Sequence, residues 1–243
     1  KGLPELVKLD LAATEIGDLG LRHLAELSSL RELRLDGTAI SDQGLAQLAG
    51  LTKLESLSLR NSYVEGEGLS HLLHLTALHS LTLDGSPIHD RGVALLSQVT
   101  WLKYLGLAYT DVTDRGMPHL ERLQDLEQLD LTSVDIGDEG MASLKVLTNL
   151  RSLSLKYTRF TDDGVVHLRP LTNLEDLDLL RTRITDAGLE TIGDLTRLRR
   201  LNLEHTDVTD DGLCQLEALT ALQNLNLDNT YVTDQGVRLL GQF

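Results

Sequence analysis

The sequence contains little that could cross-link its fold or hold a metal cluster. Its 243 residues include one cysteine, Cys214, four prolines, and as aromatics only one Trp, five Tyr and two Phe. A single thiol forms neither an internal disulfide nor a multi-cysteine zinc site. Burial of aliphatic side chains and backbone hydrogen bonds must therefore stabilise the protein, and Cys214 is expected to be an incidental surface thiol.

Positive charge is also scarce. The chain has 22 Lys and Arg against 37 Asp and Glu, which gives a formal net charge of −15. Because nucleic acids and anionic membrane surfaces are bound through Lys and Arg, neither is an expected partner. No stretch approaches the ~20 apolar residues of a membrane-spanning helix, and no signal peptide is evident. The sequence predicts a soluble protein, and it does not require an oxidising compartment, which favours the cytoplasm without establishing it.

Leucine, by contrast, recurs at a constant step of 24 residues along the whole chain. A fixed period without insertions is the signature of a solenoid, in which each repeat buries its apolar face against its neighbours. The first leucines of the ten copies are Leu6, Leu30, Leu54, Leu78, Leu102, Leu126, Leu150, Leu174, Leu198 and Leu222. Repeat positions are counted below from these leucines.

One copy, residues 198–221, shows what each repeat should form. Leu201 and Leu203 alternate with polar residues, which predicts a short strand. Thr209 supplies a hydroxyl that can cap a helix, and the carboxylate of Asp210 is favoured by the dipole of the first helical turn. Leu213 then begins a run of leucines at helical spacing. Each repeat is predicted as strand, turn, short helix and return, with right-handed crossovers between parallel strands.

Two further positions within the repeat are nearly constant. Glycine stands at position 15 of every copy although it costs a helix ~1 kcal/mol against alanine, which predicts close approach between adjacent repeats. On this basis a substitution at Gly140 should destabilise more than the same change at Gly236, where one neighbour is missing. Position nine carries Thr or Ser, which should bond the backbone of the turn. Val134 interrupts that row, so the turn of the sixth repeat is expected to deviate.

These motifs resemble the leucine-rich-repeat family over the whole chain. The half-repeat Thr-Asp-x-Gly-Leu-x-x-Leu is similar to the subclass found in F-box-associated repeats, in GALA-type bacterial effectors and in repeat proteins of environmental bacteria. The resemblance implies an α/β fold, a ribonuclease-inhibitor-like horseshoe with a concave parallel sheet and short convex helices. It also implies a role in binding other macromolecules, and it implies no chemistry.

The sequence predicts a single solenoid domain over residues 1–243. Leu3 aligns with Leu27 of the next copy and Phe243 with Leu219, and neither end shows a polar capping module, which solenoids normally need. We therefore expect either an excised segment of a longer protein or an engineered repeat protein. Its uncovered ends should favour end-to-end self-association through Leu3 or Phe243.

No residue pattern predicts catalysis, a metal site or a cofactor. Nine copies carry an Asp at position 13, but calcium needs six to eight converging oxygens, and capping of the helices explains the row better. His23 and His71 begin a series of four histidines in alternate repeats, too far apart to share one ion and better explained as surface residues. The sequence contains no phosphate-binding glycine loop and no nucleophile motif. The chain is predicted not to be an enzyme.

A partner is expected on side chains that project from the strands and the turns after them, at positions three, five, seven, eight and ten. All five tyrosines fall at these positions, and tyrosine is enriched at binding hot spots. The alternative is that aromatic residues simply favour strands. The tyrosines are Tyr63, Tyr104, Tyr109, Tyr157 and Tyr231.

A local basic cluster lies in the same sector and could receive an acidic peptide or a phosphate. It is built from Lys156, Arg159, Arg181, Arg183 and Arg200, and it flanks Tyr157 and Leu180, which is expected to be exposed. The alternative is that these arginines pair with aspartates of neighbouring repeats about 5 Å away. Trp101 is a separate candidate for an exposed contact or for ordinary packing.

The predicted partner-binding residues are Tyr63, Tyr104, Tyr109, Lys156, Tyr157, Leu180, Arg181 and Arg183. The first hypothesis for function is a non-catalytic scaffold that binds a protein or peptide on its concave face. The second is a substrate-recruiting module of a larger enzyme or signalling protein, such as a ubiquitin-ligase adaptor or a bacterial effector.

Overall fold

Every repeat opens with a three-residue strand whose middle leucine points into the protein. In the computed structural model, which describes residues 3–241, the ten strands form one parallel sheet in chain order. Equivalent residues pair in register, so that Leu177 lies beside Leu153 on one side and Leu201 on the other. The strands are β1 (Lys8–Asp10), β2 (Glu32–Arg34), β3 (Ser56–Ser58), β4 (Ser80–Thr82), β5 (Tyr104–Gly106), β6 (Gln128–Asp130), β7 (Ser152–Ser154), β8 (Asp176–Asp178), β9 (Arg200–Asn202) and β10 (Asn224–Asn226).

A short helix follows each strand on the opposite side of the repeat. The α-helices are α1 (Asp18–Leu21), α2 (Asp42–Leu45), α3 (Asp90–Leu96), α4 (Met117–Leu120), α5 (Asp138–Met141), α6 (Asp162–Val165), α7 (Asp186–Gly193), α8 (Asp210–Leu213) and α9 (Asp234–Leu240). Short 3₁₀ segments extend several of them: η1 (Arg22–Leu24), η2 (Ala46–Leu48), η4 (Leu144–Val146), η5 (Val166–Leu168) and η6 (Cys214–Leu216). The third repeat instead forms a single 3₁₀ helix, η3 (Glu67–His74).

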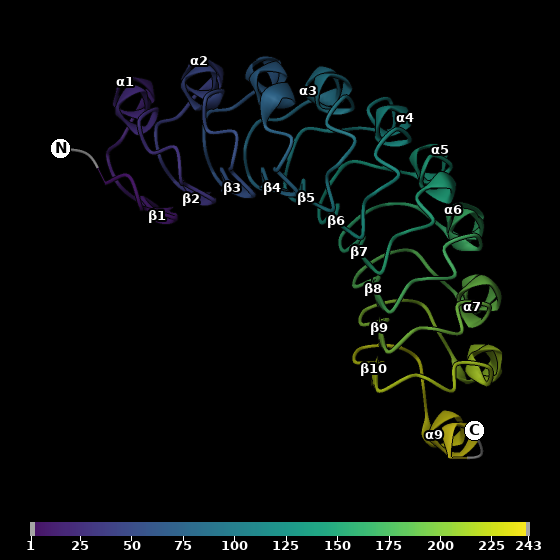
Figure 1. The fold of residues 1–243 in the computed structure, drawn as a ribbon. Coiled ribbons are helices and arrows are strands. Elements are labelled where there is room, and N and C mark those ends of the chain that lie inside the picture. The colour runs from purple at the N-terminus through teal and green to yellow at the C-terminus, as the bar shows by residue number, and fades with distance from the viewer. Residues whose placement is uncertain (1–2, 242–243) are drawn as a thin grey trace.

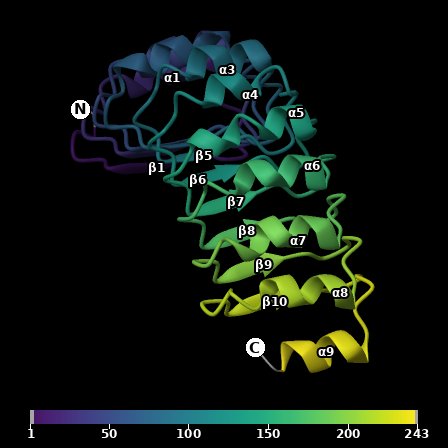
Figure 2. The same ribbon diagram turned by 90° about the vertical axis from the view of Figure 1, so that its right-hand side faces the viewer.

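The stacked repeats make an arc with the sheet on its inner side and the helices on its outer side (Figure 1). The two ends of the chain lie at opposite ends of the arc, and the strands of successive repeats stack in order when seen from the outer side (Figure 2). The predicted α/β horseshoe with a concave parallel sheet and short convex helices is therefore confirmed. No helix within residues 3–241 combines the length and the apolar character needed to cross a membrane.

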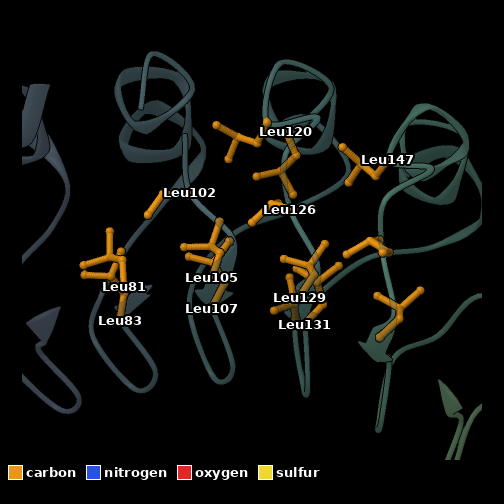
Figure 3. Packing of buried hydrophobic residues seen from close by; sticks show 14 of the residues in the cluster. Leu81, Leu83, Leu102, Leu105, Leu107, Leu120, Leu126, Leu129, Leu131 and Leu147 are labelled. Atoms are coloured by element: carbon orange, nitrogen blue, oxygen red, sulfur yellow. The ribbon is translucent and has the colours of Figure 1, made fainter. Parts of the chain in front are cut away.

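The core is a continuous layer of leucines between the sheet and the helices. Leu105 and Leu129 enter it from the strands, and Leu120 and Leu147 close it on the helical side (Figure 3). All four are at most 2% exposed. Burial is lower at both ends, where Leu9 in β1 and Leu225 in β10 are only partly covered. The repeats thus depend on their neighbours to bury their apolar faces.

Side chains at positions 12 and 13 join consecutive repeats. The predicted helix caps are present: the hydroxyl of Thr209, for example, accepts a hydrogen bond from the N–H of Asp211 at 3.3 Å. The aspartate acts differently from the expectation, because its carboxylate bonds the next repeat rather than its own helix. Asp186 accepts bonds from the N–H and the hydroxyl of Thr209, at 2.8 and 2.7 Å. The same bridge links Asp138 to Thr161.

The glycine row makes room for these carboxylates. A Cβ added to Gly188 would lie 2.5 Å from Oδ1 of Asp162 in the preceding repeat, closer than real Cβ atoms approach. A Cβ at Gly236 would meet Oδ1 of Asp210 in the same way, so the last glycine has the same contact with its preceding repeat. The packing gives no reason for Gly140 to be more sensitive than Gly236, because both glycines contact the preceding repeat and not the following one. Gly20, whose Cβ would meet only Ile16 of its own repeat, is the position without such a contact.

The turn of the sixth repeat does not deviate, contrary to expectation. Ser133 has φ of 57°, and the N–H of Val134 donates to the carbonyl of Leu131 at 3.1 Å. Thr182 makes the same backbone bond to Leu179 at 3.1 Å and adds a hydroxyl bond to that carbonyl at 2.8 Å. Val134 loses only the hydroxyl bond, and its side chain is buried.

Candidate protein-binding surface

The turn after each strand contains a residue in the left-handed backbone region. Position eight has φ near +55° to +70° in all ten repeats. Glycine and asparagine tolerate this conformation best, and other residues pay roughly 1 kcal/mol or more. Gly37, Gly85, Asn61 and Asn229 follow that preference. The other six repeats carry a different residue there, and four of these have large side chains: Tyr109 with φ of 58°, Tyr157 with φ of 58°, Arg181 with φ of 55° and His205 with φ of 56°.

These turns hold the tyrosines out from the surface. Tyr109 is 63% exposed and Tyr157 is 46% exposed. Tyr63 and Tyr231, two residues further along their own turns, are also exposed. Such exposed aromatic area on a folded monomer is typical of a contact surface. The remaining tyrosine, Tyr104, belongs to β5 and is half-buried.

Tyr104 lies within the central acidic part of the sheet. Burial raises the pKa of its phenol, and the carboxylates of Asp84 and Asp130 raise it further. Its hydroxyl reaches over Gly106, since a Cβ at that glycine would lie 3.2 Å from it. Tyr104 is therefore a neutral hydrogen-bonding group at neutral pH, positioned between two aspartates.

The predicted basic cluster divides into paired and unpaired cations. Nζ of Lys156 lies 3.7 Å from Oδ2 of Asp178, and Nε of Arg159 lies 2.5 Å from Oδ1 of Asp135. Arg181 places its guanidinium 5.7 Å from the ring centre of Tyr157, a cation–π arrangement. Within residues 3–241, neither Arg181 nor Arg183 has a carboxylate within 4.0 Å.

This absence of a partner is unusual for the surface concerned. Every other Lys or Arg at positions three, five, seven, eight and ten of the described repeats pairs with a carboxylate. These paired cations are Lys8, Arg34, Arg60, Lys156, Arg159 and Arg200. In a chain of net charge −15, two adjacent uncompensated arginines form a local site that favours an anion.

The structure corrects the expectation for Leu180 and decides between the two alternatives for Trp101. Leu180 is half-buried rather than exposed, and its N–H donates to Oδ1 of Asp178 at 3.2 Å. Trp101 packs partly against the core, and its Nε1 donates to the carbonyl of Leu75 at 3.1 Å. The packing role accounts for Trp101, which is therefore not a free aromatic contact.

The concave face also contains a hollow that the sequence did not reveal. Its volume is about 420 Å³. Repeat five creates it, because Gly106 and Ala108 there have the smallest side chains at positions five and seven of the central repeats. Its lining consists of the carboxylates of Asp84 and Asp130, the cations of Arg60 and Lys156, and the side chain of Tyr109. Alignment of the repeats would have shown that Gly106 and Ala108 are small. It would not have shown that the space beside them stays unfilled by neighbouring side chains.

Histidines and carboxylates do not come together as a metal site in the described part of the chain, where no group of three or more His, Cys, Asp or Glu side chains could hold an ion. His23, His71 and His119 are exposed, as expected of surface histidines. Cys214 is exposed, and its thiol donates to the carbonyl of Asp211 at 3.1 Å.

Comparison with known proteins agrees with this architecture. Two sequence models described as leucine-rich repeats match the chain, one over residues 139–208 and the other over residues 26–49 and 122–145. No curated protein sequence matches it. With a motif that recurs ten times and a curved parallel sheet, the chain has the fold of a leucine-rich-repeat solenoid.

Solved structures share this fold at low sequence identity. The crystal structure of an internalin from Listeria monocytogenes is 22% identical, with a TM-score of 0.53, over 98% of this chain and 85% of the internalin. A plant peptide hormone receptor, RGFR1 in complex with RGF2, is 17% identical, with a TM-score of 0.56. That match covers 95% of this chain and 45% of the receptor.

Proposed function

We propose that this chain is a non-catalytic interaction scaffold that binds a protein or peptide on its concave face and the adjoining turns, centred on repeats five to eight. The observation that supports this most strongly is the presence of Tyr109, Tyr157 and Arg181 at left-handed turn positions. The fold itself favours glycine or asparagine there. Retention of large, exposed side chains at a cost in stability is typical of residues selected for contact.

The chemistry of the surface suggests the character of the partner. Arg181 and Arg183 lack carboxylate partners within the described residues, so an acidic segment or a phosphate group would supply the missing charge. The ring of Tyr157 holds Arg181 in place and offers apolar area beside it. One fold relative, the hormone receptor, was solved with a bound peptide, and this supports a peptide as the class of partner.

Substitutions that preserve the fold test the proposal. Tyr157→Asn and Arg181→Asn install a residue that already occupies this turn position at Asn61 and Asn229. Both should leave folding intact and weaken binding of a captured partner by about thirtyfold, the loss expected at hot spots. Gln47→Ala and His119→Ala on the convex side are the matched controls and should have little effect. If the convex changes are the damaging ones, the helical face is the functional surface.

A second candidate function places the same surface within a larger protein as its substrate-recruiting module. The substitutions described above would weaken binding under either candidate function. The two functions are distinguished by the residues that flank this segment in the full-length gene. An F-box, protease or kinase domain there would favour the recruiting module. An engineered origin for the repeats would leave the surface without a natural partner, and a pull-down with the intact array distinguishes this case.

We also propose that the ends of the solenoid associate with one another. Leu3 is 64% exposed at the first repeat, while Phe243 lies outside the described residues. At the other end, Leu222, Leu225 and Leu240 border an apolar cavity of about 350 Å³. Strands β1 and β10 are the free edges of the sheet, so a second copy would continue both the sheet and the leucine layer.

A further inference from the structure

The hollow and the arginine pair sit on one surface and have opposite electrostatic character. Within the described residues, the carboxylate of Asp130 accepts hydrogen bonds only from its own repeat, from the N–H and the hydroxyl of Thr132 at 2.9 and 2.6 Å. No Lys or Arg in the described residues lies within 4.0 Å of its carboxylate. Asp84 forms an ion pair with Arg60, whose Nε lies 3.3 Å from its Oδ2, and its Oδ1 accepts a hydrogen bond from the N–H of Ala108 at 3.0 Å.

Arg60 and Lys156 also line the hollow, but both are paired. Arg60 lies 3.3 Å from Asp84, and Lys156 lies 3.7 Å from Asp178. The carboxylate of Asp130 is therefore the lining charge without an ion pair in the described residues, and it is the group that favours a positive charge in the hollow.

Aromatic groups strengthen that preference. Tyr109 stands at the rim of the hollow, and the hydroxyl of Tyr104 lies over Gly106 beside Asp84. A tyrosine face attracts a cation, and the phenol oxygen accepts hydrogen bonds from one. The combination of the unpaired carboxylate of Asp130, two tyrosines and an unfilled volume suits the long side chain of lysine or arginine. Burial raises the pKa of Asp84, and an entering cation would offset that cost of burying the carboxylate.

The repeat geometry sets the distance between this hollow and the arginine pair. The hollow is centred on Ala108 in repeat five, and Arg181 and Arg183 belong to repeat eight. Strands about 4.8 Å apart place the two features about 14 Å apart across the sheet. An extended peptide advances about 3.3 Å per residue, so about four residues span that distance. Residues i and i+4 of an extended chain also point to the same side, which lets both side chains face the solenoid.

From this geometry we infer that the partner of the concave face is an extended peptide segment with a Lys or Arg side chain in the hollow of repeat five and an acidic side chain, four residues away, on Arg181 and Arg183. The inference rests on the proposed function and adds the chemistry and the spacing of the partner. A separation of three or five residues would turn one of the two charges away from the sheet.

A phage-displayed library of random twelve-residue peptides, selected on the full 243-residue chain, tests this directly. The selected peptides should be enriched in Lys or Arg paired with Asp or Glu four residues apart. A synthetic copy of the best binder, with its charged pair moved to a separation of three, should bind about tenfold more weakly, as expected for one lost charge-assisted contact.

Variants of the protein locate each end of the peptide. Asp130→Asn should weaken the selected peptide about tenfold, and Asp10→Asn, at the same repeat position in β1, should not. Arg181→Gln should weaken it similarly, whereas Arg115→Gln on the convex side should not. Ala108→Leu fills the hollow with a side chain that position seven already carries at Leu180, so the fold should be retained while the peptide loses its cation site.

The outcomes separate this inference from the proposed function. If selected peptides lack the charged pair yet lose affinity with Tyr157→Asn, the concave scaffold stands and the spacing rule is wrong. Peptides that bind all of these variants equally well would overturn both. A library that yields no binder at all overturns the assignment of a linear peptide to this surface.

Discussion

The carboxylate of Asp186 links two repeats of this solenoid through Thr209. Its Oδ1 accepts the N–H of Thr209 at 2.8 Å and its Oδ2 accepts the hydroxyl at 2.7 Å. The same hydroxyl accepts the N–H of Asp211 and so caps the next helix. One carboxylate therefore fixes the start of its neighbour's helix, and the repetition of this contact along the convex side makes it a stabilising ladder between repeats.

Loss of one rung of this ladder should be measurable. Asp186→Ala removes two charge-assisted hydrogen bonds and leaves the partly buried N–H of Thr209 without its acceptor, so the free energy of unfolding should fall by about 2 kcal/mol. Asp211→Ala, an exposed carboxylate on the same side, should change it by less than about 0.5 kcal/mol. Urea unfolding followed by circular dichroism measures both. Equal small losses would show that the bridge contributes nothing.

Substitution of a glycine at position 15 should lower stability most where a carboxylate of the preceding repeat lies against that glycine. Gly188→Ala places a methyl group 2.5 Å from Oδ1 of Asp162 and 2.9 Å from Cγ2 of Ile184, which should cost about 2 kcal/mol. Gly20→Ala has no preceding carboxylate to displace, and its gain of about 1 kcal/mol in helix propensity offsets the close contact of the added methyl group with Cγ1 of Ile16 at 2.6 Å, so its net effect should be near zero. Thermal melts of the two variants compare them, and a larger loss at Gly20 would contradict this explanation.

The left-handed turns allow a separate test of the cost of the exposed tyrosines. Tyr109→Asn replaces a side chain disfavoured at φ of 58° by one that tolerates it, and should raise the free energy of unfolding by about 0.5 to 1 kcal/mol. Tyr63→Asn makes the same change at position ten, where φ is negative, and should not stabilise. If Tyr109→Asn destabilises as much as Tyr63→Asn, the tyrosine belongs to the fold and not to a contact surface.

The period of 24 residues determined the fold from the sequence because each repeat contains a complete strand, cap and helix with its own leucines. The caps at Thr209 and its equivalents were predictable for the same reason, since they are local. The contact of Asp186 was not predictable, because the same sequence pattern is compatible with two arrangements. In one, the carboxylate caps its own helix, and in the other it bonds the next repeat. Only the position of one repeat relative to the next in the stack decides which of these two contacts the carboxylate makes.

The candidate surface was predictable in its residues but not in its chemistry. The alternation of leucine with polar residues showed that Tyr109, Tyr157 and Arg181 face outward. Which arginines are paired depends on rotamers across repeats, and Arg159 and Arg183, equivalent in sequence, differ in this respect. The hollow depends on which side chains fail to fill space, and no local pattern encodes this.

Two aspartates at the same repeat position should contribute to the pH dependence of stability with opposite sign. Asp36 and Asp84 both occupy position seven. Burial alone would raise the pKa of Asp36, but hydrogen bonds from Ser58, Arg34 and the N–H of Arg60 outweigh burial and lower it. Burial raises the pKa of Asp84, and the N–H of Ala108 and the charge of Arg60 only partly oppose this.

The sign of each effect on stability follows from linkage. Asp36 stabilises the fold above its unfolded pKa of about 3.9, and that contribution is lost as the pH falls through its lower folded value. Ionised Asp84 lowers stability at neutral pH, and this penalty disappears as the pH falls through its raised folded value. At pH 7, Asp36→Asn should therefore destabilise and Asp84→Asn should stabilise. Urea melts from pH 7 to pH 3 should show both differences shrinking, and parallel curves for the two variants would contradict the assignment.

The open ends of the solenoid should make association depend on concentration. Leu225 in β10 and Leu240 in α9 border the apolar cavity of the last repeat, and both are only partly covered. A second copy that docks its first repeat there would bury this surface and pair β1 with β10. Such a head-to-tail contact does not close on itself, so it should give a series of oligomers and not a single dimer. Leu225→Lys places a charge in this contact and should shift the protein toward the monomer, whereas Val166→Lys, at an exposed valine of η5 in the middle of the array, should not. Light scattering across a concentration series measures the average mass. A strictly monomeric protein at high concentration would show that neither end needs a partner.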